Sequence, residues 1–129
     1  MMVADTDVLI DFLENRSPVA RRIALEVERG QLRTTVITRF ELLAGARTAR
    51  QRMTVGELIA ALPCLPLDDA GADSAAEIRR ALEGAGVGIG MADSLIAGIV
   101  VVNKGVLLTR NRRHFERVPG LSLGRLESN

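Results

Sequence analysis

Short runs of β-forming residues alternate with longer runs of helical periodicity along almost the whole chain. Strands that alternate with helices in this way are typical of βαβ units, whose strands pair in parallel and whose helices cover both faces of the sheet. We therefore predict an α/β fold of three layers with a short, mostly parallel sheet of about five strands. The expected strands are Met2–Ala4, Leu32–Ile37, Pro63–Leu67, Val106–Leu108 and, at an edge of the sheet, Leu121–Leu126.

Five or six helices are expected between these strands, because apolar residues recur there three or four positions apart. Thr38 has the character of a helix cap, and Gly30 that of a helix stop. The stretch Met91–Asn103 is apolar almost all round, which indicates a buried helix. The expected helices are Val8–Leu13, one from Pro18 to Gly30, one from Thr38 to near Gly45, Arg50–Leu62, Asp69–Leu82 and Met91–Asn103, with a glycine-rich loop at Gly84–Gly90.

Length and composition exclude several classes of protein. A chain of 129 residues fits one domain, over residues 1–129. The single cysteine, Cys64, excludes an internal disulfide, and one cysteine with one histidine argues against a Cys/His zinc site. The longest apolar stretch, Leu95–Val102, is about eight residues, whereas a membrane span needs roughly 18. With no signal-peptide pattern at the N-terminus, we expect a cytoplasmic protein without membrane contact and read Cys64 as a core residue.

Three acidic residues far apart in the sequence are expected at one edge of the sheet. Asp5 follows the first strand directly, Glu41 lies in the first turn of the helix after the second strand, and Asp93 lies in the first turn of the buried helix. Open parallel sheets bind ligands at the carboxyl ends of their strands, where the following helices begin. Each acid also has a local explanation, since acids favour helix N-termini and Thr38–Glu41 matches a capping box.

The three carboxylates together favour a metal site. Anions held close together raise one another's pKa, and a divalent cation relieves that repulsion. Mg²⁺ and Mn²⁺ prefer oxygen ligands of this kind. The sequence therefore predicts a site for Mg²⁺ or Mn²⁺ at Asp5, Glu41 and Asp93.

The segments that carry these acids resemble the PIN-domain nucleases, and within them the VapC-like toxins of bacterial and archaeal toxin–antitoxin pairs. Val3–Asp11 is similar to the first acidic motif of that family, Thr38–Gly45 to the second and Ala92–Ala97 to the third. Leu108–Asn111, His114–Phe115 and Val118–Leu121 resemble its closing segment. The resemblance covers nearly the whole chain, with the four pieces in the family's order.

The resemblance implies a three-layer α/β/α PIN-like fold and a metal-dependent endoribonuclease that hydrolyses RNA phosphodiester bonds. It implies that Asp5, Glu41 and Asp93 are the catalytic residues and metal ligands, with one or two Mg²⁺ or Mn²⁺ ions. It further implies the role of toxin, with three partners: an RNA substrate, a small VapB-like antitoxin whose tail enters a groove near the active site, and a second copy of the chain in a homodimer.

The closing segment departs from the family pattern. Many PIN nucleases carry a fourth acid there, whereas this chain has Asn111 and His114. Asn111 is a candidate ligand through its amide oxygen, or a holder of a metal-bound water. The loss of one charge weakens any second metal site, so the number of ions stays open. His114 is either a general acid or a residue that packs or caps in the turn.

Five further residues are candidates for substrate contact. Thr6, Ser94 and Thr109 either support the ligands and phosphate by hydrogen bonds or serve as local caps and turns. Arg110 and Arg112 begin a basic cluster that either touches RNA phosphate, forms an exposed turn or grips an acidic partner segment.

Alternative functions remain open from the sequence. One is a non-catalytic PIN-like module that holds RNA or a protein without cutting it, which the missing fourth acid motivates. The other is a haloacid-dehalogenase-like phosphatase, because Asp5-Thr6-Asp7-Val8 after a strand fits the first motif of that class. In that class the later acid pair follows the threonine, whereas here Asp68-Asp69 precedes Thr109. Asp11 and Glu14 are expected in solvent.

Overall fold

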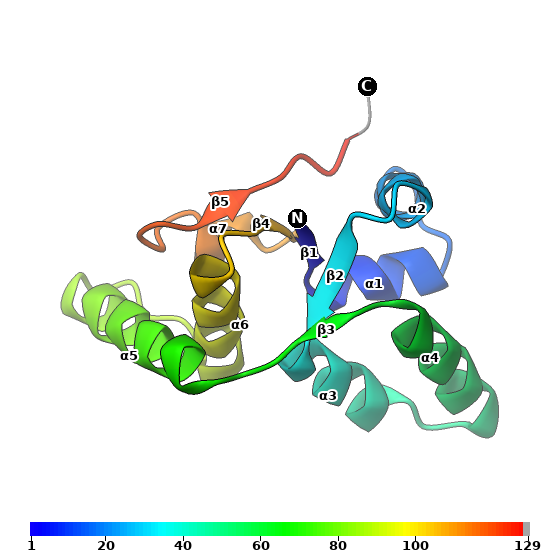
Figure 1. Ribbon diagram of the computed structural model, residues 1–129, viewed down its shortest axis with the longest axis horizontal. Helices are drawn as coiled ribbons and strands as arrows, with labels where there is room; N and C mark the ends of the chain where they lie inside the picture. Colours follow the sequence, from blue (N-terminus) through cyan, green and yellow to red (C-terminus); the bar gives the residue numbers. More distant parts are fainter. Residues whose placement is uncertain (128–129) are drawn as a thin grey trace.

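A parallel sheet forms the middle of the molecule, as the computed structural model of residues 1–127 shows (Figure 1). Its strand order is β3-β2-β1-β4-β5, and every neighbouring pair is parallel. The predicted α/β class and the short five-stranded sheet are therefore confirmed. The strands are β1 (Met2–Ala4), β2 (Leu32–Thr35), β3 (Cys64–Leu65), β4 (Val106–Leu108) and β5 (Ser122–Leu123).

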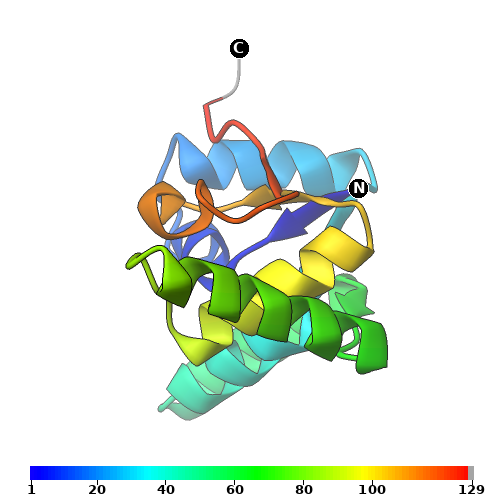
Figure 2. The same cartoon turned by 90° about the vertical axis from the view of Figure 1, so that its left-hand side faces the viewer.

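Helices cover both faces of this sheet, which gives the predicted three layers (Figures 1 and 2). One face is covered by α1, α2 and α4, and the other by α5, α6 and the short α7. The helices are α1 (Thr6–Leu13), α2 (Val19–Glu28), α3 (Val36–Gly45), α4 (Ala49–Ala61), α5 (Asp69–Gly84), α6 (Met91–Val102) and α7 (Arg112–Phe115).

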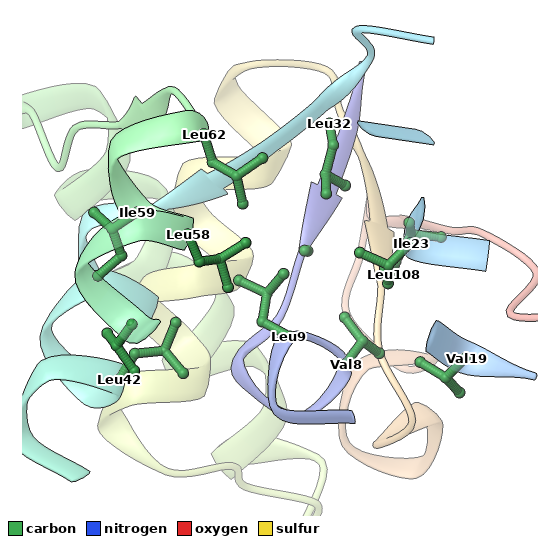
Figure 3. Packing of buried hydrophobic residues seen from close by; sticks show 12 residues of the cluster. Val8, Leu9, Val19, Ile23, Leu32, Leu42, Leu58, Ile59, Leu62 and Leu108 are labelled. Atoms are coloured by element: carbon green, nitrogen blue, oxygen red, sulfur yellow. The ribbon is translucent and has the colours of Figure 1, made fainter. Parts of the chain in front are cut away.

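The two central strands supply both apolar cores, because successive side chains of a strand point to opposite faces. Ala4 and Leu108 belong to the first core with residues of α1, α2 and α4, and Figure 3 shows Leu9 and Leu58 meeting there. Val3 and Leu107 belong to the second core with residues of α5, α6 and α7. With apolar side chains on both faces, β1 and β4 are buried. Their carboxyl ends lie between the two helix layers.

Helix α6 lies against α5 at close range. It buries Ser94 and the run from Ile96 to Val100, which confirms the predicted buried helix. A Cβ atom at Gly98 would lie 2.6 Å from the Gly71 carbonyl oxygen and 2.7 Å from the Ala75 nitrogen. The backbones of α5 and α6 therefore touch at Gly98, and only glycine fits there.

Several element boundaries differ from the predicted ones. Strand β2 ends at Thr35, because the Thr35 hydroxyl accepts a hydrogen bond from the Thr38 backbone N–H (3.1 Å) and so caps α3. The prediction that Thr38 caps this helix is wrong. Glu41 therefore lies in the second turn of α3, not in its first. Strand β3 is shorter than predicted, and helix α1 begins at Thr6 instead of Val8.

The C-terminal part of the chain also differs in detail. Strand β5 lies at the sheet edge as predicted but ends at Leu123, after which the carbonyl groups of Gly124 and Arg125 accept hydrogen bonds from Arg112 (3.0 Å) and Arg22 (2.8 Å). Helix α7 was not predicted. Its four residues are anchored by Phe115, which is fully buried.

Within residues 1–127, none of the helices combines the length and the apolar character that a membrane crossing requires.

Candidate active site

Asp5 lies where β1 meets α1, at the carboxyl edge of the sheet. Its backbone N–H donates to the Leu108 carbonyl oxygen of β4 (2.9 Å), and its side chain caps α1 by accepting from the Thr6 backbone N–H (2.8 Å). The Thr109 hydroxyl donates to the other carboxylate oxygen at 2.7 Å. Asp5 and Thr109 are both buried, so these contacts hold the carboxylate in one orientation.

The surroundings of Asp5 disfavour its charge. Burial raises the pKa of the Asp5 carboxyl from 3.8 to about 6, against the lowering effect of the Thr109 and Thr6 hydrogen bonds. The charges of Asp7 and Asp93 raise this pKa further. A buried carboxyl group that is pressed by like charges is typical of a functional site, and a cation would relieve the pressure.

Thr6 joins Glu41 to this centre. The Thr6 hydroxyl donates to Glu41 Oε1 at 2.6 Å, and its oxygen lies 3.1 Å from the hydroxyl oxygen of buried Thr38. Glu41 therefore turns toward the start of α1, from a position 35 residues further along the chain. No capping box forms at Thr38, so the local explanation for Glu41 is wrong.

Asp93, in the first turn of α6, contacts the closing segment of the chain. Its Oδ2 lies 3.1 Å from His114 Nδ1, and the amide nitrogen of Asn111 lies 2.8 Å from the same ring nitrogen. The Asn111 backbone N–H donates to the Thr109 hydroxyl oxygen (3.0 Å), and that hydroxyl donates to Asp5. Asp93, His114 and Asn111 thus adjoin Asp5 through Thr109.

Two further acids near Asp5, which are Asp7 and Asp11, also belong here. Asp7 accepts from the Arg110 backbone N–H (3.1 Å), and burial raises the pKa of its carboxyl. Asp7 Oδ1 is buried without a hydrogen-bond partner within residues 1–127. Asp11 is buried, not solvated as predicted, and pairs with Arg110 Nε at 2.7 Å. The i, i+4 spacing of Asp7 and Asp11 on one face of α1 was the signal that could have found them.

The remaining candidates have local partners. Ser94 is buried and donates to the Gly90 carbonyl oxygen at 2.9 Å, within its own helix turn. Arg112 donates to the Gly124 carbonyl oxygen at 3.0 Å, and the guanidinium of Arg110 pairs with Asp11. Glu14 is exposed, in agreement with its expected position.

The donor groups at this edge suit a hard divalent cation. Carboxylate oxygens predominate, one of them without a partner, and burial penalises the charge of Asp5. In residues 1–127, however, no group of three or more His, Cys, Asp or Glu side chains is arranged so that it could hold a metal ion. Asp5, Glu41 and Asp93 each bind a hydroxyl or imidazole group instead. The residue types therefore fit a metal, and these hydrogen bonds compete with it.

A pocket of about 540 Å³ opens beside Glu41, between α1, α3 and α4. Its walls are mostly apolar and include Ile10, Leu13, Leu42 and Val55. Glu41 lines the pocket as well as binding Thr6, so the pocket reaches the acidic centre.

Comparison with known proteins gives a consistent picture. The sequence model of the PIN domain matches residues 2–121. "Ribonuclease VapC10" of Mycobacterium tuberculosis is 36% identical over 117 residues, which cover 89% of this chain and 86% of that protein. A "tRNA(fMet)-specific endonuclease VapC" of Salmonella typhimurium is 30% identical over 123 residues and covers 92% of each chain.

A solved structure agrees with this sequence similarity. A chain of the DNA-bound VapBC complex of Salmonella typhimurium has a TM-score of 0.86 to this fold, 28% sequence identity and coverage of 97% of each chain.

Proposed function

This chain belongs to the PIN-domain family and its VapC-like ribonucleases, and from this premise we propose that it is a toxin whose RNA cleavage depends on a divalent metal held by Asp5, Glu41 and Asp93. The observation that carries the proposal is the state of Asp5. Its carboxyl group is buried, faces the charges of Asp7 and Asp93, and has a pKa raised to about 6. A cation bound there would offset the cost of holding this acid.

The metal proposed is Mg²⁺ or Mn²⁺. When bound, such an ion lowers the pKa of a water and offsets the charge that develops on the scissile phosphate. Asp5 is oriented for this ion by Thr6 and Thr109, and Asp93 lies beside it on α6. Glu41, which now accepts a hydrogen bond from Thr6, would hold the ion or orient the attacking water. Arg110 and Arg112 stay candidates for holding the RNA near this edge, whereas Thr109 is fully buried and acts through Asp5.

Cleavage of RNA by the purified chain tests this proposal. We expect Mg²⁺ or Mn²⁺ to support cleavage and EDTA to abolish it. Asp5→Asn and Asp93→Asn should each abolish cleavage while the circular dichroism spectrum stays unchanged, and Glu41→Gln should reduce it strongly. Asp73→Asn is the matched control, because Asp73 is an exposed acid on α5. An Asp5→Asn variant that cuts RNA at the wild-type rate contradicts the proposal. RNA binding without cleavage in either metal would favour a non-catalytic module.

We also propose that a VapB-like antitoxin binds the pocket between α1, α3 and α4. Solved relatives are VapBC complexes. The pocket is mostly apolar, has Glu41 in its wall and Arg50 at its edge, and so suits an amphipathic segment that would cover the acidic centre. Ile10, which is 39% exposed in this pocket, gives the test. Ile10→Glu should abolish co-purification with a co-expressed VapB-like antitoxin, whereas Val27→Glu, on α2 outside the pocket, should not.

The exposed face of α3 suits a second copy of the chain. Phe40 and Leu43 are 69% and 43% exposed, and their i, i+3 spacing places them on one side of the helix. Apolar side chains grouped in this way mark contact surfaces. A homodimer through α3 and a location in the cytoplasm, where RNA is available, complete the proposal.

A further inference from the structure

The Asp93, Asn111 and His114 side chains form a cluster whose hydrogen bonds conflict. His114 Nδ1 lies 3.1 Å from Asp93 Oδ2 and 2.8 Å from Asn111 Nδ2. A ring nitrogen carries either a proton or a lone pair. With a proton, it donates to Asp93 but faces the amide N–H groups of Asn111. With a lone pair, it accepts from Asn111 but faces the Asp93 carboxylate.

A half-turn of the Asn111 amide, which exchanges its nitrogen and oxygen without changing its shape, removes this conflict. Nδ1 then faces two oxygens, which either share its proton or ligate a metal ion together with it. The imidazole nitrogen and both oxygens are all able to ligate metal. Neighbouring ligands of an octahedral ion at about 2.1 Å lie about 3 Å from each other. The separations of 3.1 Å and 2.8 Å in this cluster match that spacing.

The fold holds the three side chains in these positions. Asp93 lies in the first turn of α6, and Asn111 is tied through its backbone N–H to Thr109. His114 lies on α7, next to Phe115, which is fully buried in the second core. Because Thr109 also binds Asp5, the cluster lies beside the proposed metal ligand Asp5.

We propose that His114 ligates the metal through Nδ1, together with Asp93 and Asn111, and that this nitrogen makes the site prefer a transition-metal ion such as Mn²⁺ over Mg²⁺. The inference rests on the proposed function, because it concerns the same metal centre. Mg²⁺ requires oxygen ligands, whereas imidazole binds transition-metal ions well. His114 thus adds a nitrogen ligand beside Asp93 at the proposed metal centre.

Electron paramagnetic resonance of bound Mn²⁺ tests this directly, because His114 is the only histidine of the chain. The protein is purified without a histidine tag, and its histidine is labelled with ¹⁵N. We expect electron spin-echo modulation from a directly bonded ¹⁵N nucleus in the wild-type protein and none in His114→Ala. In His114→Ala, Mn²⁺ affinity should fall at least about tenfold, the lower end of what even an indirect ligand partner contributes. The affinity for Mg²⁺ should fall less than the affinity for Mn²⁺ in this variant. In His114→Asp, the ratio of Mn²⁺ to Mg²⁺ affinity should be smaller than in the wild-type protein.

Glu116→Gln is the matched control, since it removes an exposed acid two residues from His114 and should leave Mn²⁺ binding unchanged. Bound Mn²⁺ without coupling to the histidine nitrogen contradicts the inference, as does wild-type Mn²⁺ affinity in His114→Ala. If the wild-type protein also cleaves RNA with metal in that case, the proposed function stands and only the role of His114 fails. If Mn²⁺ and Mg²⁺ do not bind at all, both fail.

Discussion

Asp5 shows how a single residue can serve a site at the expense of the fold. Its carboxylate accepts two hydrogen bonds, yet burial and two neighbouring acids still raise its pKa to about 6. Ionisation is therefore easier in the unfolded chain than in the native one. Above the native pKa, the protein without metal is destabilised by the charge of Asp5.

The first prediction concerns this cost. The carboxyl pKa is 3.8 in the unfolded chain and about 6 in the fold, so protonation favours the fold. This stability is fully present below pH 3.8 and is lost as the pH rises through about 6. At pH 7.5 in EDTA, Asp5→Asn should raise the free energy of unfolding by up to about 3 kcal/mol, since one pKa unit corresponds to about 1.4 kcal/mol.

Urea denaturation at pH 7.5 and at pH 3.5 measures this effect. At pH 3.5 the advantage of Asp5→Asn should be small, because Asp5 is then mostly protonated in the wild-type protein. Divalent metal should stabilise the wild-type protein and leave Asp5→Asn unchanged. An Asp5→Asn variant that is less stable than the wild-type protein at pH 7.5 in EDTA would contradict the assigned origin of the raised pKa.

The second prediction concerns Thr109, whose hydroxyl donates to Asp5 and accepts from Asn111. Thr109→Val keeps the shape of this fully buried side chain but removes both bonds. A hydrogen bond to a charged group contributes about 1.5–3 kcal/mol, so unfolding free energy at pH 7.5 should fall by that amount. RNA cleavage should fall about 10- to 100-fold. Thr109→Ser keeps the hydroxyl and should stay within about threefold of wild-type activity. An equal loss of RNA cleavage in both variants would argue against a role for the hydroxyl group.

Among the elements, the α5–α6 pair shows packing that overrides helix propensity. Alanine is a better helix former than glycine by about 1 kcal/mol, yet α6 has Gly98 in its middle. The reason lies in α5, because a Cβ atom at Gly98 would come within 2.8 Å of three α5 atoms, two of them backbone atoms. This close contact holds the α6 helix, which carries Asp93, against α5.

The third prediction compares Gly98 with Gly56. Gly98→Ala should lower the free energy of unfolding by about 1–3 kcal/mol, because the helices must separate. Gly56→Ala, at an exposed position of α4 with nothing within 4 Å of its Cβ position, should raise stability by up to about 1 kcal/mol. Thermal or urea denaturation of both variants measures the two changes in unfolding free energy, which should have opposite signs. A Gly98→Ala protein as stable as Gly56→Ala would mean that the helices are less tightly packed than described.

For the molecule as a whole, the proposed contacts lie on different surfaces. The antitoxin pocket lies between α1, α3 and α4, whereas Phe40 and Leu43 project from the exposed side of α3. A dimer through α3 would therefore leave the pocket open to its partner.

The fourth prediction tests that arrangement. Phe40→Glu places a charge in the proposed contact and should convert a dimer into a monomer, as light scattering coupled to size-exclusion chromatography would show. Val27→Glu, at an exposed apolar site on α2, should leave the dimer intact. A dimer that persists in both variants would place the interface elsewhere. A wild-type protein that is a monomer in solution would exclude the proposed homodimer.

Much of this molecule could be read from the order of residues. The alternation of apolar strands and periodic helices predicted the parallel three-layer fold, because burial on both faces leaves a distinct pattern in the sequence. The positions of Asp5 and Asp93 beside strand and helix ends followed from the same pattern. Local signals were less reliable at boundaries, where Thr35 and Thr38 offer equivalent capping hydroxyls and only the helix start distinguishes them.

What the sequence alone determined was the layer order and the edge at which its acids lie. The tertiary structure decided which partner each side chain has: Glu41 binds Thr6, Asp11 is buried against Arg110, and His114 joins Asp93. These contacts join residues from 21 to 99 positions apart. Hydrogen bonds and ion pairs depend on distances within a few tenths of an ångström, which only the packing of α1, α3, α6 and α7 around β1 and β4 sets.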